Sequence, residues 1–405
     1  MNSRPKYLVV TSSTLLVILL LIGSLLSGKS TAPEGAYRQL AVYTEVLHRI
    51  KSEYVEEPDL KSVTLGALNG LLESIDPFAS YLNAEQYKDY LKNKDLRRAG
   101  VGLILSKKFG YVGVVGTVPG SPAAKAGLTT GDMLETIQGV ATRDMPLAYA
   151  QLLLNGDAGS SIELTVVRVR RPEPQAIKLV RANFPDPPVA ARMLANQVGY
   201  IAPETLPSSR SKLVAAAIEN LQKQGAQKLV LDLRNCALGE PQEGIALANL
   251  FLSNGTITYL KGQKVPRQDF NAETGKAVTT LPVVVITNRG TADAAEIAAA
   301  ALLDNKRAQV VGERTYGDAS LRKAITMEDG GAIILSVAKY YSPSGKPIQD
   351  AGVTPTVVMA EPETQVDVDE NGEPLPEAPE PQQRKTEEDP LLKKAIEILG
   401  GNATA

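Results

Sequence analysis

The feature that most constrains the fold is an alternation of apolar and helical segments between residues 190 and 360. The segments with almost continuous apolar side chains are residues 198–202, 228–233, 282–287, 308–312, 324–327 and 332–340. Helical patterns lie among them at residues 211–225, 241–252 and 294–303. Apolar strands that alternate with helices are typical of a sheet covered on both faces. The pattern therefore predicts an α/β domain.

The preceding part of the chain has a different pattern. Short β-type runs separated by glycine and proline turns occupy residues 101–105, 112–118, 133–137, 162–169 and 176–180. Two short helical pieces, at residues 122–126 and 146–154, interrupt them. This predicts a small β-sandwich capped by two helices. Upstream, apolar residues at spacings of three and four predict helices over residues 37–91.

The two ends of the chain differ from the rest. Arg4 and Lys6 precede an uncharged apolar run over residues 7–27, long enough to span a bilayer. It predicts a signal anchor at residues 1–30, with the N-terminus cytoplasmic and the bulk exported to the cell envelope, either periplasmic or extracytoplasmic. Because residues 30–32 (STA) resemble a cleavage site, a removed signal peptide and secretion are the alternative.

Near the C-terminus, residues 361–389 hold 11 acidic and 2 basic residues together with several prolines. This composition predicts a disordered linker. An amphipathic helix at residues 390–399 follows, and we expect it to dock onto the core.

Composition excludes several function classes. The net charge of −2 gives no electrostatic case for nucleic-acid binding. One cysteine, Cys236, allows no internal disulfide, and with one histidine it allows no Cys/His zinc cluster. A Ser-His-Asp mechanism would have to use His48, which lies on a helical segment far from any paired hydroxyl and carboxylate. We therefore expect His48 to be a structural or surface residue.

Residues 97–182 resemble a PDZ domain. The stretch GSPAAKAGL at 120–128, followed by GDML at 131–134, is similar to the central signature of that module. Gly100, Val101, Gly102 and Leu103 stand where a PDZ domain has its carboxylate-binding loop. The resemblance implies that backbone N–H groups of this loop grip the C-terminal carboxylate of a peptide that adds as a strand.

From about residue 37 to residue 399 the chain resembles the carboxyl-terminal processing peptidases, the tail-specific serine proteases of family S41. Besides the PDZ-like stretch, three motifs carry the resemblance: GALNGLLESIDPFASYL at 66–82, LDLRN at 231–235 and YYSPSGKPIQ at 340–349. It implies a multidomain α/β protein with an N-terminal helical region at 37–95, a PDZ β-sandwich at 97–182 and an S41-type core at 190–360.

The resemblance also implies the site. The family uses a serine nucleophile, a neutral lysine base and an oxyanion hole, with no metal and no cofactor. In the motif NRGTADAAE at 288–296, Asp293 stands at the position of the serine. In VGERTYGDASLR at 311–322, Asp318 stands at the position of the lysine and Arg322 at that of an assisting glutamine. Leu238 replaces the first glycine of the family's NPGG loop.

These replacements are severe. A carboxylate is a poor acyl acceptor, and residue 293 has no hydroxyl for Asp318 to activate. Losing nucleophile and base removes most of the rate enhancement in such hydrolases. The sequence therefore predicts a member of the family that has kept the fold and lost the chemistry.

Two alternatives would retain chemistry. Thr291 or Ser320 could act as a displaced nucleophile with Lys323 as base, although a shift of even 1 Å is costly. Alternatively, Asp293 and Asp318 could form an acidic pair that shares a proton or binds a cation.

Three functions follow as hypotheses. The first is an exported, membrane-anchored pseudoprotease that binds protein C-termini through its PDZ domain or regulates an active protease. The second is an active serine-type endopeptidase that processes the C-termini of exported proteins. The third is a dimeric scaffold that self-associates through residues 37–91, a region that mediates self-association in relatives. A homodimer is expected in any case.

Overall fold

The computed structural model describes residues 34–93, 99–108, 110–143, 145–168, 171–360 and 389–400. The predicted signal anchor at 1–30 lies outside these residues, as does the predicted acidic linker at 361–389 apart from Asp389. The chain divides into two compact units, one up to Leu65 and one from Gly66 onward, which are taken separately. No helix of the described residues is long and apolar enough to cross a membrane.

The described part of the first unit is helical. Helix α2 (Glu34–Glu53) is followed by α3 (Leu60–Glu73), which continues into the second unit. On α2 the Arg49 guanidinium lies 2.6 Å from the Glu53 carboxylate, one turn along the exposed face. His48 is an exposed residue of the same helix, a surface position as the sequence predicts.

The PDZ domain is an antiparallel sheet with strand order β2-β3-β4-β6-β7, and β5 pairs with β4. Its strands are β2 (Leu103–Lys108), β3 (Tyr111–Thr117), β4 (Met133–Ile137), β5 (Val140–Ala141), β6 (Ser161–Arg168) and β7 (Arg171–Val180). Its helices are α5 (Pro122–Lys125) and α6 (Leu147–Leu154). In this order β2 and β7 are the edge strands. Alternate residues of the strands, such as Leu134 and Leu164, are fully buried between sheet and helices.

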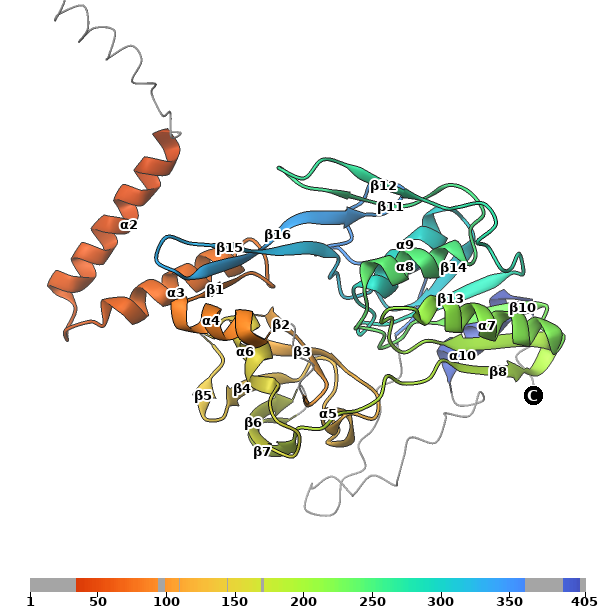
Figure 1. Ribbon diagram of the computed structural model, residues 1–405, viewed down its shortest axis with the longest axis horizontal. Coiled ribbons are helices and arrows are strands. Elements are labelled where there is room, and N and C mark those ends of the chain that lie inside the picture. The colour runs from red at the N-terminus through yellow and green to blue at the C-terminus, as the bar shows by residue number, and fades with distance from the viewer. Residues whose placement is uncertain are drawn as a thin grey trace, which may run out of the picture. The chain divides into compact units, whose positions relative to one another are not determined.

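The core of the peptidase-like part is a six-stranded sheet with order β17-β14-β13-β10-β9-β8 (Figure 1). Its strands are β8 (Ala190–Leu194), β9 (Val198–Ala202), β10 (Lys228–Asp232), β13 (Val283–Thr287), β14 (Ala308–Gly312) and β17 (Val357–Val358). All neighbours are parallel except β8 and β9. Leu229 and Leu231 pack toward α7 (Arg210–Lys223), α8 (Pro241–Asn249) and α9 (Ala294–Asp304). Val230 faces the other side, so both faces are apolar as the sequence predicts.

A second, antiparallel sheet was not predicted as a unit. Strand β16 (Ala332–Tyr341) is its centre and pairs with β1 (Ser80–Leu82), β11 (Thr256–Lys261) and β15 (Ser320–Thr326), and β12 (Gln268–Asn271) pairs with β11. Helix α4 (Ala84–Asn93) follows β1. The buried Asp76 carboxylate accepts hydrogen bonds from the N–H groups of Phe78 (2.9 Å) and of Ser336 (3.3 Å) on β16. It thereby ties the 66–82 motif to the second sheet.

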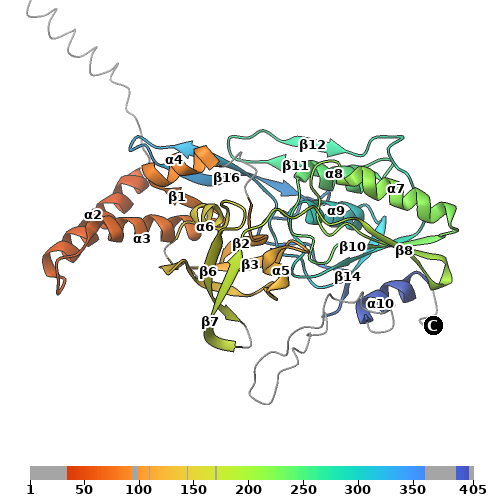
Figure 2. The same ribbon diagram turned by 60° about the horizontal axis from the view of Figure 1, so that its bottom comes forward.

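The C-terminal helix α10 (Pro390–Ile398) packs on the face of the parallel sheet opposite α7, α8 and α9. Leu391, Leu392 and Ala395 are fully buried there, against β13 and β14 (Figure 2). Asp389 caps the helix by accepting from the Leu392 N–H at 3.0 Å. The predicted docking of this helix onto the core is therefore observed.

Arg234 connects this helix to the end of β10. Its guanidinium lies 2.6 Å from the Asp389 carboxylate and 2.5 Å from that of Asp232, and all three side chains are nearly buried. The Tyr200 hydroxyl donates to Asp232 at 2.9 Å. Burial raises the pKa of Tyr200, and the neighbouring Asp232 adds to the shift, so this phenol stays a hydrogen-bond donor. The α10 cap is thus fixed to the strand that leads into the candidate site.

Candidate functional site

Asp293 occupies a strained turn between β13 and α9. Its φ is 54° and its ψ is −123°, which lies outside the left-handed region that aspartate tolerates. Such backbone strain costs about 1–3 kcal/mol and collects at functional sites. A sharp strand-to-helix turn is also the geometry that exposes the nucleophile of other hydrolases. The backbone at residue 293 therefore has the form of a reactive position, while the side chain is a carboxylate.

The Asn288 side chain holds this turn against the loop after β10. Its Oδ1 accepts from the N–H groups of Asn235 (3.0 Å) and Gly290 (3.0 Å), and its Nδ2 donates to Asn235 Oδ1 (2.9 Å). The Ala292 N–H donates to the carbonyl of Cys236 at 3.0 Å. These bonds fix the loop of residues 235–239 beside Asp293. Burial raises the pKa of the Cys236 thiol, so this cysteine is an inert core group.

Glu296 organises the other side of the site. This carboxylate is fully buried on the first turn of α9. It accepts from the N–H groups of Gly317 (2.8 Å), Asp318 (2.8 Å) and Asp293 (3.2 Å), and from the Thr315 hydroxyl. Burial raises the pKa of Glu296 to about 8, although the Thr315 hydroxyl and the two N–H groups of the 317–318 loop work in the opposite direction. Glu296 therefore joins the turn of Asp293 to the loop that carries Asp318.

The Asp318 carboxylate already has a charged partner within the protein. Its carboxylate forms an ion pair with Arg322, and the Arg322 guanidinium lies 4.1 Å above the centre of the Phe78 ring. Burial raises the pKa of Asp318, although Arg322 favours its charged form. A carboxylate held by a guanidinium is a weaker and less mobile base than a free one.

Asp293 lies near enough to Asp318 for their charges to interact. Burial and the Asp318 carboxylate together hold the pKa of Asp293 well above its usual range, while Arg322 acts in the opposite direction. We name Asp293, Glu296, Asp318 and Arg322 together the elbow site. Across the described residues, no group of three or more His, Cys, Asp or Glu side chains is arranged to hold a metal ion.

The alternative nucleophiles have structural partners. Thr291 is fully buried, and its hydroxyl donates to the Leu233 carbonyl at 2.8 Å. The Ser320 hydroxyl lies 2.8 Å from that of Ser336 on the neighbouring strand. Lys323 is exposed. Neither hydroxyl is oriented by a lysine, so the geometry gives no support to a displaced nucleophile.

The PDZ domain packs directly on the loops of the elbow site. Val115 of β3 forms a buried apolar cluster with Ala237 and Ala292, and Ile104 and Tyr316 pack against it. The Tyr316 hydroxyl also bonds to that of Ser106 on β2. Leu238, in contrast, is 43% exposed. Strands β2 and β3 of the PDZ domain are thus in direct contact with the loops that flank the elbow site.

The four residues of the predicted carboxylate loop do not all have free N–H groups. Gly100 donates its N–H to the Ala182 carbonyl at 3.1 Å. Within the described residues, no partner is found for the N–H groups of Val101 and Gly102. The Val118 N–H donates to the Gly102 carbonyl at 2.8 Å, a pattern that directs the Leu103 N–H away from β3. The N–H groups of Val101, Gly102 and Leu103 are therefore not used by β3 or by another backbone group among the described residues.

Two contributions to the site were missed by sequence reasoning. Glu296 was visible as the last residue of the 288–296 motif, but nothing local indicates that it receives four hydrogen bonds. The stacking of Arg322 on Phe78 joins residues far apart in the chain, and no sequence signal points to it.

An α/β core with a strained strand-to-helix turn, joined to a small β-sandwich of PDZ form, defines the class of PDZ-containing, peptidase-like proteins. Residues 197–359 match the model of peptidase family S41, and residues 113–168 match that of a PDZ domain. The carboxy-terminal-processing protease of Bartonella bacilliformis is 34% identical over 336 residues, covering 81% of this chain and 77% of the relative. The carboxyl-terminal-processing protease of Synechocystis sp. is 34% identical over 321 residues, covering 77% and 75%.

A solved structure agrees. The photosystem II D1 C-terminal processing protease has a TM-score of 0.65 and 28% identity, covering 78% of this chain and 86% of that one. The chain belongs to peptidase family S41, with the carboxy-terminal processing proteases among its relatives.

Proposed function

We propose that this protein is a member of the S41 family that binds protein C-termini and does not cleave them. The observation that carries the proposal is the ion pair between Asp318 and Arg322. At the position that the resemblance assigns to the lysine base, the chain has a carboxylate that is held by a guanidinium. At the position assigned to the serine, Asp293 has no hydroxyl. Neither residue can supply a serine-type nucleophile or its base.

The packing of the PDZ domain over the loops beside the elbow site supports the same proposal. Ala237 and Ala292, which flank the site, are 5% and 2% exposed beneath the β2–β3 side of the PDZ domain. This apolar contact covers the loops on either side of Asp293, although residue 293 itself stays partly exposed. The N–H groups of Val101, Gly102 and Leu103, which have no partner among the described residues, would offer a bound peptide hydrogen bonds that the paired groups of the elbow site do not offer.

Location and partners form part of the proposal. The apolar segment near the N-terminus would anchor the chain in the membrane, with the bulk exported, so the ligands would be C-termini of exported proteins. An active protease is a second candidate partner. Leu40, Val42 and Val46 of α2 are each at least 50% exposed, which supports self-association through this helix and the scaffold function as a second candidate.

The test of the chemistry is incubation of the full-length chain with an unfolded, casein-like protein. We expect no fragments above a buffer control. Cleavage that Asp293→Ala or Asp318→Ala abolishes would overturn the proposal and indicate an acidic-pair mechanism. Cleavage that only Thr291→Ala or Ser320→Ala abolishes would indicate a displaced serine-type nucleophile, and thus an active endopeptidase.

A further inference from the structure

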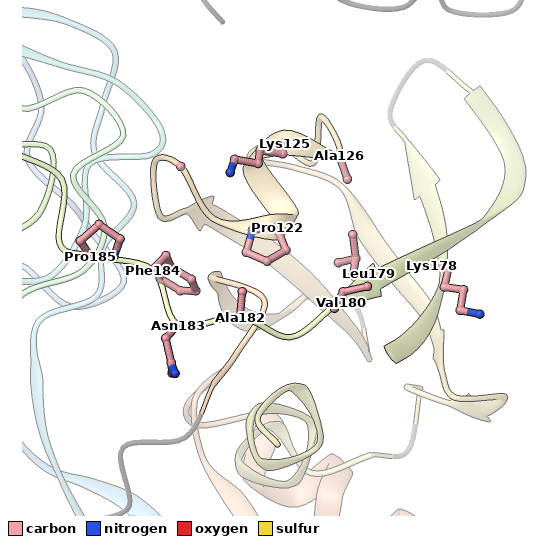
Figure 3. A pocket seen from close by; sticks show the side chains of 11 residues that line it. Pro122, Lys125, Ala126, Lys178, Leu179, Val180, Ala182, Asn183, Phe184 and Pro185 are labelled. Carbon is pink, nitrogen blue, oxygen red and sulfur yellow. The ribbon is translucent and has the colours of Figure 1, made fainter. Parts of the chain in front are cut away.

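The PDZ domain has a hollow beside the end of β7, next to the bridge between Ala182 and Gly100. A cavity of about 450 Å³ lies between α5, the end of β7 and residues 182–185. Pro122, Val180 and Phe184 contribute apolar surface to it, and Figure 3 shows these side chains arranged around the opening. The volume falls within the range of about 300–1,000 Å³ that small-ligand sites occupy. We name this cavity the β7 hollow.

The backbone of β7 is open toward this hollow. Ser161 of β6 is paired with Val180, and the Arg181 N–H donates to the Ser160 carbonyl at 2.8 Å. In an antiparallel ladder this pattern directs the N–H and C=O of Val180, and those of Lys178 two residues before, away from β6. Within the part of the chain that the structure describes, the outward N–H groups of both residues have no backbone partner.

The same edge is already used for pairing one step further along. Ala182 exchanges two hydrogen bonds with Gly100, at 3.0 and 3.1 Å. The outward groups at residues 178 and 180 continue the line of this bridge. An open strand edge beside an apolar hollow is the geometry for β-strand addition.

The charges at the margin of the hollow select the strand that would fit. Lys125 on α5 and Lys178 on β7 are both exposed lining residues. Neither forms an ion pair with another residue in the described ranges. Two cations beside an apolar surface favour a segment in which acidic and small apolar side chains alternate, because alternate residues of a strand face opposite sides.

We propose that the β7 hollow is a second peptide site, which takes an extended, acidic, internal segment of a partner protein by strand addition to β7. Its outward N–H groups alternate along β7, at residues 178 and 180, whereas those of residues 101–103 follow one another, so the two places differ in the ligand they select. An anionic membrane surface would use the lysines but not the open peptide edge. The protein would then hold one partner at two places, or two partners at once.

The test uses the full-length chain and a fluorescent peptide of alternating glutamate and valine residues, blocked at both ends so that no terminal carboxylate is present. We expect the peptide to bind, and the double variant Lys125→Glu/Lys178→Glu to bind it on the order of tenfold more weakly, since two attractions become repulsions. A peptide with lysine in place of glutamate, and one N-methylated at alternate residues, should not bind detectably.

The matched control is Lys212→Glu/Lys223→Glu, which reverses two exposed charges on α7 and should leave this affinity unchanged. The proposal is overturned if the double variant binds as well as the unaltered chain, or if the N-methylated peptide binds normally. It is also overturned if anionic vesicles bind through the two lysines while the blocked peptide does not. Because the blocked peptide cannot use the carboxylate loop, failure here leaves the proposed capture of C-termini untouched.

Discussion

The carboxylate loop of the PDZ domain and the elbow site differ in what their polar groups are doing. At the loop, the N–H groups of Val101 and Gly102 find no partner among the described residues. At the elbow site, Glu296 accepts four hydrogen bonds and Asp318 is paired with Arg322. At the loop two backbone N–H groups have no partner among the described residues, whereas at the elbow site the charged side chains are paired with groups of the protein itself.

The hydrogen bonds that hold the elbow site do not depend on which side chains stand at residues 293 and 318. The turn at Asp293 is held by Asn288, Glu296 and backbone groups, none of which requires a serine at residue 293 or a lysine at residue 318. The interactions that specify the scaffold are therefore separable from the side chains that would react. Four predictions test this separation.

The largest effect should come from Glu296→Ala. It removes the acceptor of four hydrogen bonds in a fully buried place, so we expect the free energy of unfolding to fall by about 3 kcal/mol or more. Unfolding in urea measures this free energy. Glu273→Ala, which removes only an exposed pair with Lys276, is the control and should cost less than about 1 kcal/mol. Equal losses for the two variants would mean that Glu296 does not organise the site.

Asp389→Ala should have the next largest effect. It leaves Arg234, which is 11% exposed, with Asp232 as its remaining carboxylate, and it removes the cap of α10. We expect a loss of about 2 kcal/mol in the same urea measurement. Glu397→Ala breaks an exposed pair with Lys394 on the same helix and should be nearly neutral. If both variants unfold alike, the helix does not stabilise the end of β10 through this ion pair.

Leu103→Asp should weaken the binding of a C-terminal peptide more than it lowers the free energy of unfolding. The new carboxylate would repel that of a bound C-terminal peptide, so we expect at least a tenfold rise in the dissociation constant, or about 1.4 kcal/mol. Asp293→Ala should leave the affinity unchanged. Fluorescence anisotropy measures both, and a urea midpoint checks that each variant is folded. A reversed pattern, with Asp293→Ala weakening binding, would place the ligand at the elbow site.

The smallest effect concerns pH. Burial raises the pKa values of Glu296, to about 8, and of Asp293 and Asp318. The folded state therefore holds more protons than the unfolded state above the ordinary carboxyl range, and stability should fall as pH rises toward 8. We expect the free energy of unfolding to fall between pH 6 and pH 8, and to fall less in Asp293→Asn. Stability that instead rises over this interval would contradict the raised pKa values of Glu296 and Asp293.

Local patterns predicted much of the fold. The strands β4, β9 and β14 begin and end at the predicted residues, because each is a short apolar run bounded by turn residues. The strands β1, β8, β11 and β12 were not predicted. Strand β1 has three residues and pairs with β16, some 250 positions away, so its stability comes from a partner that no local pattern reveals.

The sequence predicted which residues form the candidate site, but it did not predict how their side chains contact one another. Motif spacing located Asp293, Asp318 and Arg322, but pairing of the last two across four residues is a property of the folded loop. Likewise, Gly100 has the expected place in the carboxylate loop, yet its N–H is used by Ala182. Hydrogen bonds between distant segments depend on tertiary packing and leave no local pattern in the sequence.

The central claim is that the chain binds C-termini without cutting them, and one measurement tests both parts. A fluorescent peptide with a free, apolar C-terminal residue is incubated with the full-length chain, beside the same peptide amidated, and anisotropy and peptide mass are followed together. Charge-assisted hydrogen bonds contribute about 1.5–3 kcal/mol, so the free peptide should bind at least tenfold more tightly than the amidated one and keep its full mass. Equal binding of the two peptides, or a free peptide that is shortened by the unaltered chain and left whole by Asp293→Ala, would contradict the account.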